Sequence, residues 1–266
     1  MYEDRILAFI DVLGFSKAIK KTIQEDGTEN LVETQRIDNL LNEAHKMLSK
    51  YYPSDDTFVN TKVTRYFSDS IVISYLITEE SGIFHLLAEV LFLCVTALQD
   101  GFLFRGAIVH DKLYHKENKI FGPAMIKATN LEKNLAIYPR IILDDEILDI
   151  AEKYPAKWPS KNKQLKVIKK LISKDFDGLN YINYFDGINY VVGEENGISV
   201  YLKSLRTTII KLREDMGENI SIKSKFLWLK EKYNTVLIEY KRKYSKENKR
   251  LEFPELCDYL ENATLF

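Results

Sequence analysis

The pattern of apolar and polar positions near the start of the chain predicts a buried strand that ends at an acid. Five apolar residues run from Ile6 to Ile10 and are followed by Asp11. A tight turn, Gly14-Phe15-Ser16, comes next, and residues 17–21 begin a helix. The pattern therefore places one carboxylate at the end of a core strand. An ordinary alternative is that Asp11 only caps the helix that follows.

Further along the chain, helical spacing of apolar residues alternates with runs of β-branched and aromatic residues. These runs predict a helix over 31–51, a hairpin of strands 57–67 and 70–75 with its turn at Ser68-Asp69, a helix over 81–98, strands 102–109 and 112–121 separated by a turn at His110-Asp111, a helix over 122–135, a strand over 140–143 and a helix over 144–152. A hairpin inside an alternating pattern is typical of a ferredoxin-like α+β sandwich and not of a doubly wound parallel sheet.

Beyond residue 152 the pattern changes. Residues 154–174 are polar and rich in Lys, with two prolines that indicate loops, and residues 176–192 are aromatic and allow for a further hairpin. Two amphipathic helices are predicted over 198–216 and 222–244. We predict a first domain, 1–152, that carries the chemistry, and a mostly helical C-terminal extension, 153–266, that packs on this domain or across a dimer.

Composition and charge narrow the choice of partners and compartment. The net charge is -1, although residues 201–250 hold fourteen Lys or Arg against six Asp or Glu. We read these helices as solvated amphipathic faces and expect neither nucleic acid nor membrane as a partner. The apolar window Ile83–Leu98 carries His85 and Glu89 and is shorter than a membrane span. With two cysteines and no leader pattern, we expect a cytoplasmic protein.

A second acid, Asp69 at the tip of the predicted hairpin, gives Asp11 a partner. In a ferredoxin-like sheet the first strand lies beside the following hairpin, so the two carboxylates can converge. Carboxylates from adjacent rigid elements hold Mg²⁺ or Mn²⁺ together with phosphate oxygens. The backbone N–H groups of Gly14, Phe15 and Ser16 offer donors to those phosphates. The sequence thus indicates a site for cations and a triphosphate.

At these residues the sequence resembles the class III nucleotidyl cyclases, which include the adenylate and guanylate cyclases. The family's strand–Asp–Ile–x–Gly–Phe–Thr motif is matched by residues 11–16, and its hairpin Gly-Asp is matched by Ser68-Asp69, with Ser for Gly. The order of elements also fits, including the strand 105–108 and the helix led by Gly122. The resemblance covers roughly residues 5–150 and implies a class III cyclase sandwich.

The resemblance implies that Asp11 and Asp69 hold two divalent cations, Mn²⁺ or Mg²⁺, with a backbone carbonyl from Val12, and that residues 14–16 bind the β- and γ-phosphates of a nucleoside triphosphate. The cations would activate the ribose 3′-hydroxyl and neutralise the departing pyrophosphate. Class III sites form between two cyclase domains, so the resemblance implies a homodimer with paired sites.

The chain departs from the family at the residues that complete catalysis. The family places an Asn and an Arg four residues apart on the helix after the last hairpin, and those positions are Ile126 and Asn130 here. Neither residue can take over the missing role. Arg105 and Arg140, near strand ends, are the candidate substitutes, and a structural ion pair is the alternative for both, favoured for Arg140.

The positions that read the base also depart from the family. They fall on Arg65 and Lys119, two cations where purine cyclases pair a donor with an acceptor. Two fixed donors suit a ring edge rich in carbonyl oxygens, which favours uracil over cytosine. This resembles the pyrimidine cyclases of bacterial anti-phage signalling, which make cyclic UMP or cyclic CMP. Solvated strand residues are the ordinary alternative for both positions.

Three other functions stay open at this point. The loss of the helix Asn and Arg favours a degenerate cyclase-fold protein that binds a nucleotide as a regulator, and retention of both acids argues against it. A purine cyclase is a further alternative. A polymerase-like nucleotidyltransferase shares the topology and the two-acid logic, but the sequence shows no template-binding segments.

Overall fold

The structure is a computed structural model that describes residues 1–49, 61–116, 119–155, 161–186, 191 and 196–266. It contains two compact units. The first comprises Met1–Leu93 and Leu103–Ile182, and the second comprises Cys94–Phe102 and Asn183–Phe266. Residues 153–182 group with the first unit in this division, and the domain boundary predicted after residue 152 stays a prediction.

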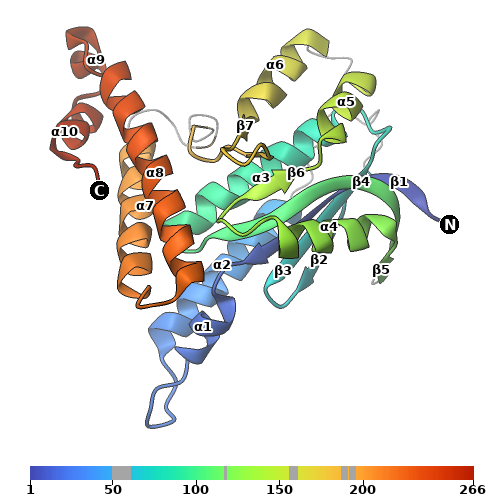
Figure 1. The fold of residues 1–266 in the computed structure, drawn as a ribbon, viewed down its shortest axis with the longest axis horizontal. Coiled ribbons are helices and arrows are strands. Elements are labelled where there is room, and N and C mark those ends of the chain that lie inside the picture. The colour runs from blue at the N-terminus through green and yellow to red at the C-terminus, as the bar shows by residue number, and fades with distance from the viewer. Residues whose placement is uncertain (50–60, 117–118, 156–160, 187–190, 192–195) are drawn as a thin grey trace. The chain divides into compact units, whose positions relative to one another are not determined.

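The first unit alternates strands and helices along the chain (Figure 1). Its elements are β1 (Glu3–Val12), α1 (Phe15–Lys20), α2 (Leu31–Ser49), β2 (Val63–Phe67), β3 (Ser70–Leu76), α3 (Gly82–Gln99, whose end belongs to the second unit), β4 (Phe104–Lys116), β5 (Lys119–Phe121), α4 (Pro123–Asn134), β6 (Ile141–Leu143), α5 (Glu146–Lys153), α6 (Lys161–Leu171), β7 (Ile172–Lys174) and β8 (Asn180–Ile182).

The sheet confirms the predicted ferredoxin-like α+β fold. Its strand order is β2-β3-β1-β4-β6-β8-β7, with β5 paired to β4. The four strands β2, β3, β1 and β4 are antiparallel to their neighbours, and β1 lies between β3 and β4. With helices between β1 and β2 and between β3 and β4, this is the split β-α-β arrangement.

The pairing register decides which side chains share a face of the sheet. Residues directly opposite each other in antiparallel strands point to the same side. Asp11 therefore shares a face with Ser70 on β3 and Arg105 on β4, and we call this side of the sheet the carboxylate face. Arg65, opposite Val72, also belongs to it, because Val72 pairs in turn with residue 9 of β1.

Helices α2 and α3 cover the other side of the sheet. The hydroxyl of Tyr66, which faces away from the carboxylate face, donates to the carbonyl of Ala44 on α2 at 3.3 Å. The hydroxyl of Tyr75 donates to Glu89 on α3 at 3.0 Å. The carboxylate face instead meets α4, through an ion pair between Arg105 and Glu132.

Helix α3 is the most apolar element. It has 18 residues and a mean hydropathy of 1.8, so it is long and apolar enough to cross a membrane. From the sequence we expected a segment too short for this, because only the window Ile83–Leu98 was considered there. However, 67% of the helix is buried within the structure, as in the core helix of a soluble protein. Leu86, Leu87 and Val90 are fully buried.

One local prediction was wrong. No turn separates residues 109 and 112, because β4 runs without interruption from Phe104 to Lys116 and keeps its register with β1 through Leu113. Residues 154–174, for which the sequence indicated loops only at the two prolines, also contain α6 and β7, which were not predicted. The further hairpin exists, but it pairs β7 with β8 and turns at Gly178, whose φ of 84° favours glycine.

The second unit contains the predicted C-terminal helices. They are α7 (Asn196–Glu214), α8 (Ile220–Lys243), α9 (Glu247–Glu252) and α10 (Pro254–Asn262), and α10 contacts both α7 and α8 (Figure 1). Asn219 caps α8, because its side-chain oxygen accepts from the N–H of Ile222 at 3.1 Å. Buried aromatic residues, including Tyr233 and Trp228, fill the packing between these helices.

Candidate active site

The two predicted acids come together at one end of the sheet. Asp11 lies opposite Ser70, the first residue of β3, and Asp69 directly precedes it. The N–H of Val12 donates to the carbonyl of Asp69 at 3.0 Å, which fixes the hairpin tip against the end of β1. The antiparallel register therefore makes neighbours of two residues that are 58 positions apart in the sequence.

The turn after β1 has the backbone donors that the sequence predicts. Gly14 has a φ of 75°, a conformation that favours glycine, and its carbonyl accepts from the N–H groups of Lys17 and Ala18 at the start of α1. The N–H of Leu13 donates to the carbonyl of Leu103 at 2.8 Å. Among the described residues, the N–H groups of Gly14, Phe15 and Ser16 meet no backbone acceptor, as is usual for a first helical turn.

Arg105 joins Asp11 to an acid that the sequence analysis missed. Its Nε lies 3.1 Å from Oδ2 of Asp11 and 2.7 Å from Oε1 of Glu132 on α4. Across the described part of the chain, the terminal nitrogens of Arg105 have no hydrogen-bond partner. A sequence signal for Glu132 did exist: Ala124, Ala128 and Glu132 recur at the i+4 spacing of the buried helix face, where an acid needs a partner.

Burial acts on both carboxylates. The pKa of Asp11 is raised, chiefly because burial disfavours its charged form, and the charge of Asp69 adds to this while Arg105 and Ser70 oppose it. The pKa of Glu132 is raised for the same main reason, with Asp11 adding to the effect and Arg105 opposing it. Arg105 thus leaves both acids only partly compensated.

The two predicted base-reading residues differ in their surroundings. Arg65 projects from β2 on the carboxylate face, and its buried Nε has no acceptor among the described residues. Its charge contributes to lowering the pKa of His115, so it lies near the last residues of β4. Lys119 is exposed on β5, opposite Lys116. No interaction joins Arg65 to Lys119 within the described chain.

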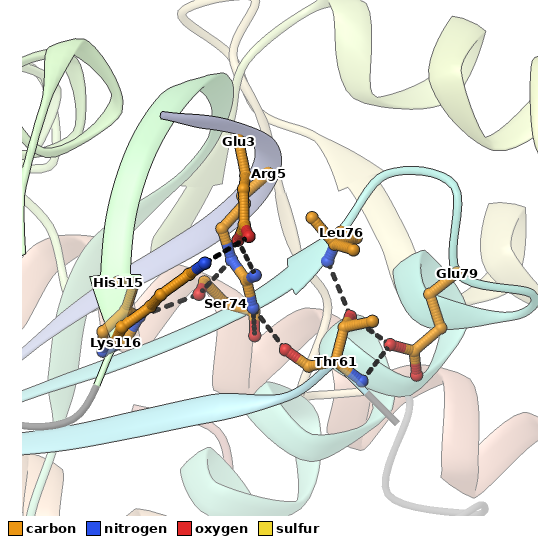
Figure 2. A network of polar contacts seen from close by, with 8 residues as sticks. All are labelled: Glu3, Arg5, Thr61, Ser74, Leu76, Glu79, His115 and Lys116. Atoms are coloured by element: carbon orange, nitrogen blue, oxygen red, sulfur yellow. Dashed lines mark hydrogen bonds and ion pairs between the residues drawn. The ribbon is translucent and has the colours of Figure 1, made fainter. Parts of the chain in front are cut away.

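Figure 2 shows the contacts that join the last residues of β4 to side chains of β1 and β3. Nδ1 of His115 lies 2.8 Å from the hydroxyl of Ser74, which also accepts from Nε of Arg5 at 2.9 Å. Nζ of Lys116 lies 3.0 Å from Glu3. We call Arg5, Ser74 and His115 the Arg5 network.

The exposure of Ile126, Asn130 and Arg140 shows which of them lies in the protein interior. Ile126 is 64% exposed on α4, and Asn130 is exposed one turn further on. Arg140 is fully buried, and its guanidinium bonds to Asp175 and Asp177 next to the β7–β8 hairpin. Arg140 is therefore the structural ion pair that the sequence analysis favoured.

The donor set at Asp11 fits a hard divalent cation. Two carboxylates, one near the end of β1 and one in the turn between β2 and β3, with the backbone of Val12 beside them, offer the oxygen ligands that Mg²⁺ and Mn²⁺ prefer while leaving room for phosphate oxygens and water. Their partial compensation also favours added positive charge. Among the described residues no group of three or more His, Cys, Asp or Glu side chains forms a metal cage, so this is an open site of paired acids.

Comparison with known proteins adds a fold-level likeness. No protein-family model matches the chain, and no curated protein is significantly similar to it. Among solved structures, it is similar to the monomeric guanylyl cyclase domain of the RhoGC fusion protein from the aquatic fungus Blastocladiella emersonii. The similarity spans 68% of this chain and 94% of that one, with 9% identity and a TM-score of 0.43. These values carry no argument about activity, which rests on the residues of this chain.

Proposed function

We propose that this protein is a nucleotidyl cyclase that converts a pyrimidine nucleoside triphosphate, UTP in preference to CTP, into the 3′,5′-cyclic monophosphate and pyrophosphate. The observation that carries the proposal is the meeting of Asp11 and Asp69 at one end of an antiparallel sheet, beside a turn with unused backbone N–H groups. An N-terminal cap alone does not account for this arrangement, because Gly14 occupies the cap position of α1.

In this proposal Asp11, Asp69 and the carbonyl of Val12 hold two divalent cations, Mn²⁺ or Mg²⁺. When bound, such cations neutralise the triphosphate and lower the pKa of the ribose 3′-hydroxyl. The N–H groups of residues 14–16 orient the β- and γ-phosphates. The chain's part in catalysis is therefore mainly positioning and electrostatic stabilisation, as in other phosphoryl-transfer sites.

Arg105 supplies the positive charge that the family takes from the helix. It is bonded to Asp11 through Nε, and its terminal nitrogens are unused among the described residues, so they can donate to the α-phosphate as negative charge develops. This would let a chain with Asn130 at the usual Arg position remain active.

Arg65 and Lys119 are the proposed determinants of the base. The support is that Nε of Arg65 is buried without an acceptor on the carboxylate face, which a carbonyl oxygen of uracil would satisfy. The exposed position of Lys119 suits a residue that reaches a site shared with a second subunit. A purine cyclase would need an acceptor for the amino group of its base, and neither Arg65 nor Lys119 provides one.

We further propose a cytoplasmic homodimer that acts as an anti-phage signalling enzyme. Ile126, Phe121 and Leu135 in and beside α4 are 64%, 49% and 41% exposed, and burial of such residues favours association. The anti-phage role comes from the resemblance to pyrimidine cyclases alone.

A nucleotide panel tests the proposal. Purified protein is incubated with Mn²⁺ and each of the four triphosphates, and products are separated by chromatography. We expect cyclic UMP as the main product, with a loss of about 10³-fold or more in Asp11→Asn and Asp69→Asn, since a bound metal contributes several kcal/mol of transition-state stabilisation. Asp145→Asn is the matched control, because Asp145 is an exposed acid of the first unit outside the site.

The outcomes separate the competing functions. Preferred cyclisation of ATP or GTP would refute the pyrimidine assignment. Mn²⁺-dependent nucleotide binding without any cyclic product would favour the regulatory protein. Full activity in Asp11→Asn would remove the central claim.

A further inference from the structure

We infer that Glu132 is a positioning residue that holds Arg105 when a divalent cation takes its place at Asp11. In the structure the guanidinium of Arg105 is the counter-ion of Asp11, and Glu132 forms a second ion pair with it. This inference rests on the proposed function, because it concerns the cation that Asp11 would hold.

The geometry brings the guanidinium and a cation into competition. Nε of Arg105 is 3.1 Å from Oδ2 of Asp11, and that oxygen is also a candidate metal ligand. Two positive groups on one carboxylate repel each other, and water screens the repulsion only in part, because the side chains of Asp11 and Arg105 are 18% and 31% exposed. Arg105 must therefore weaken its bond to Asp11 before a cation can bind tightly.

Glu132 lets Arg105 release Asp11 at a small cost in free energy. Its Oε1 is only 2.7 Å from the same Nε, closer than Asp11, and its side chain is only 10% exposed, so little water competes for the guanidinium. A guanidinium that left Asp11 with no second partner would stay partly buried and unpaired, which is costly. Oε1 of Glu132 has no hydrogen-bond donor among the described residues, so it is available to accept from Arg105 once Asp11 is released, and the ion pair with Glu132 keeps Arg105 beside the reaction centre.

The inference predicts opposite effects on metal binding from two neighbouring residues. Removing the charge of Glu132 should leave Arg105 bound more firmly to Asp11 and weaken Mn²⁺ binding. Removing the charge of Arg105 should free Asp11, so Mn²⁺ binds at least as tightly as in the wild type. Couplings between sites commonly change affinity by about 5–150-fold, and we expect roughly 10-fold for Glu132→Gln.

The experiment is Mn²⁺ titration of the full chain without nucleotide, by calorimetry, for wild type, Glu132→Gln, Arg105→Gln and the double variant. We expect Glu132→Gln to bind about 10-fold more weakly, and the double variant to bind like Arg105→Gln. Asp145→Asn controls for the loss of one distant carboxylate, and Glu132→Asp should recover most of the affinity. Circular dichroism confirms folding of each variant.

The double variant decides the question. If Glu132→Gln weakens Mn²⁺ binding as much without Arg105 as with it, then Glu132 acts by direct attraction of the metal and the inference is wrong. If Glu132→Gln does not fold, the comparison of Arg105→Gln with wild type remains, and weaker Mn²⁺ binding in Arg105→Gln overturns the inference. If wild type binds Mn²⁺ and Asp11→Asn does not, but Glu132→Gln matches wild type, only this inference fails. If wild type and Asp11→Asn bind Mn²⁺ equally, the proposed function fails with it.

Discussion

The two ends of the carboxylate face differ in how completely their buried charged groups are paired. At one end, the guanidinium of Arg5 is bonded to Glu3, to the carbonyl of Thr61 and to both the hydroxyl and the carbonyl of Ser74. At the other end, Asp11, Asp69 and Glu132 lie close together, and among the described residues Arg105 is the guanidinium that pairs with Asp11 and Glu132. At the first end every nitrogen of the Arg5 guanidinium has a partner, although Nε2 of the neighbouring His115 has none among the described residues, whereas at the second end Arg105 compensates the acids only in part.

The hydrogen bonds around Arg5 continue outward as a connected network (Figure 2). The N–H of Thr61 donates to Glu79 at 2.7 Å, and the hydroxyl of Thr61 accepts from the N–H of Leu76 at 2.8 Å. Arg5 is only 3% exposed, so these partners replace nearly all of its water. Saturated buried polar groups stabilise one conformation, whereas acids that lack partners are expected where a ligand completes them.

The largest effect that would test this contrast is the loss of Arg5. Because Arg5→Met leaves its buried acceptors unpaired, we expect the free energy of unfolding to fall by about 3–5 kcal/mol. Urea denaturation measures this loss. Mn²⁺ affinity of the folded protein should be unchanged, since the change lies at the far end of the face.

Arg36→Met is the matched control for this variant. Arg36 forms an i,i+3 ion pair with Glu33 on the surface helix α2, and its loss should cost less than about 1 kcal/mol. Equal losses for the two arginines would show that the Arg5 network is not a structural anchor.

An effect of intermediate size is expected in the pH dependence of folding stability, because of His115. Burial, with the nearby charges of Arg5 and Arg65, lowers the pKa of His115 to about 4 from its ordinary value of 6.5. Between these values the unfolded chain binds a proton that the folded chain does not, so stability is lost as pH falls from 6.5 towards 4. The slope reaches at most about 1.4 kcal/mol per pH unit.

Denaturation midpoints of His115→Gln measured across this pH range check the assignment. The variant should lose this part of the pH dependence, and His45→Gln, on the exposed side of α2, should keep it. If the two variants show the same pH profile as wild type, His115 does not titrate as the structure implies.

The smallest expected effect is a gain in stability when Asp11 is replaced by Asn. The raised pKa of Asp11 means that the folded state disfavours its charged form, so stability falls as pH rises through that pKa. Without metal at pH 7, Asp11→Asn should therefore be more stable than wild type by roughly 0.5–1 kcal/mol. Such a gain raises the melting temperature by about 2–4 °C per kcal/mol.

Added Mn²⁺ should reverse this order, because a ligand that binds only the folded wild type stabilises it by mass action. Thermal unfolding with and without Mn²⁺ measures both parts. A metal-free Asp11→Asn that melts below wild type would mean that Asp11 is a structural partner of Arg105 and nothing more.

The sequence predicted the parts of the fold that depend on local pattern. The apolar run before Asp11, the hairpin around Asp69 and the long C-terminal helices each have a clear periodicity, and the structure contains them. The order of these elements was enough to predict the ferredoxin-like sheet, because few arrangements accommodate a hairpin between two crossovers.

What the sequence did not predict depends on contacts between distant positions. The pairing of Arg105 with Glu132 joins a strand to a helix face, and no local pattern fixes such a pair. The continuity of β4 was missed because His110-Asp111 has the composition of a turn, although the long pairing with β1 outweighs that local preference.

The length of β4 has a consequence for precision. One strand carries Arg105 near its first residue and His115 near its last, roughly 33 Å apart along the extended chain. Contacts with the Arg5 network fix the C-terminal end of β4, so the strand is a rigid support for the guanidinium of Arg105 at its N-terminal end. The position of Arg105 is then set partly by side chains at the far end of the same strand.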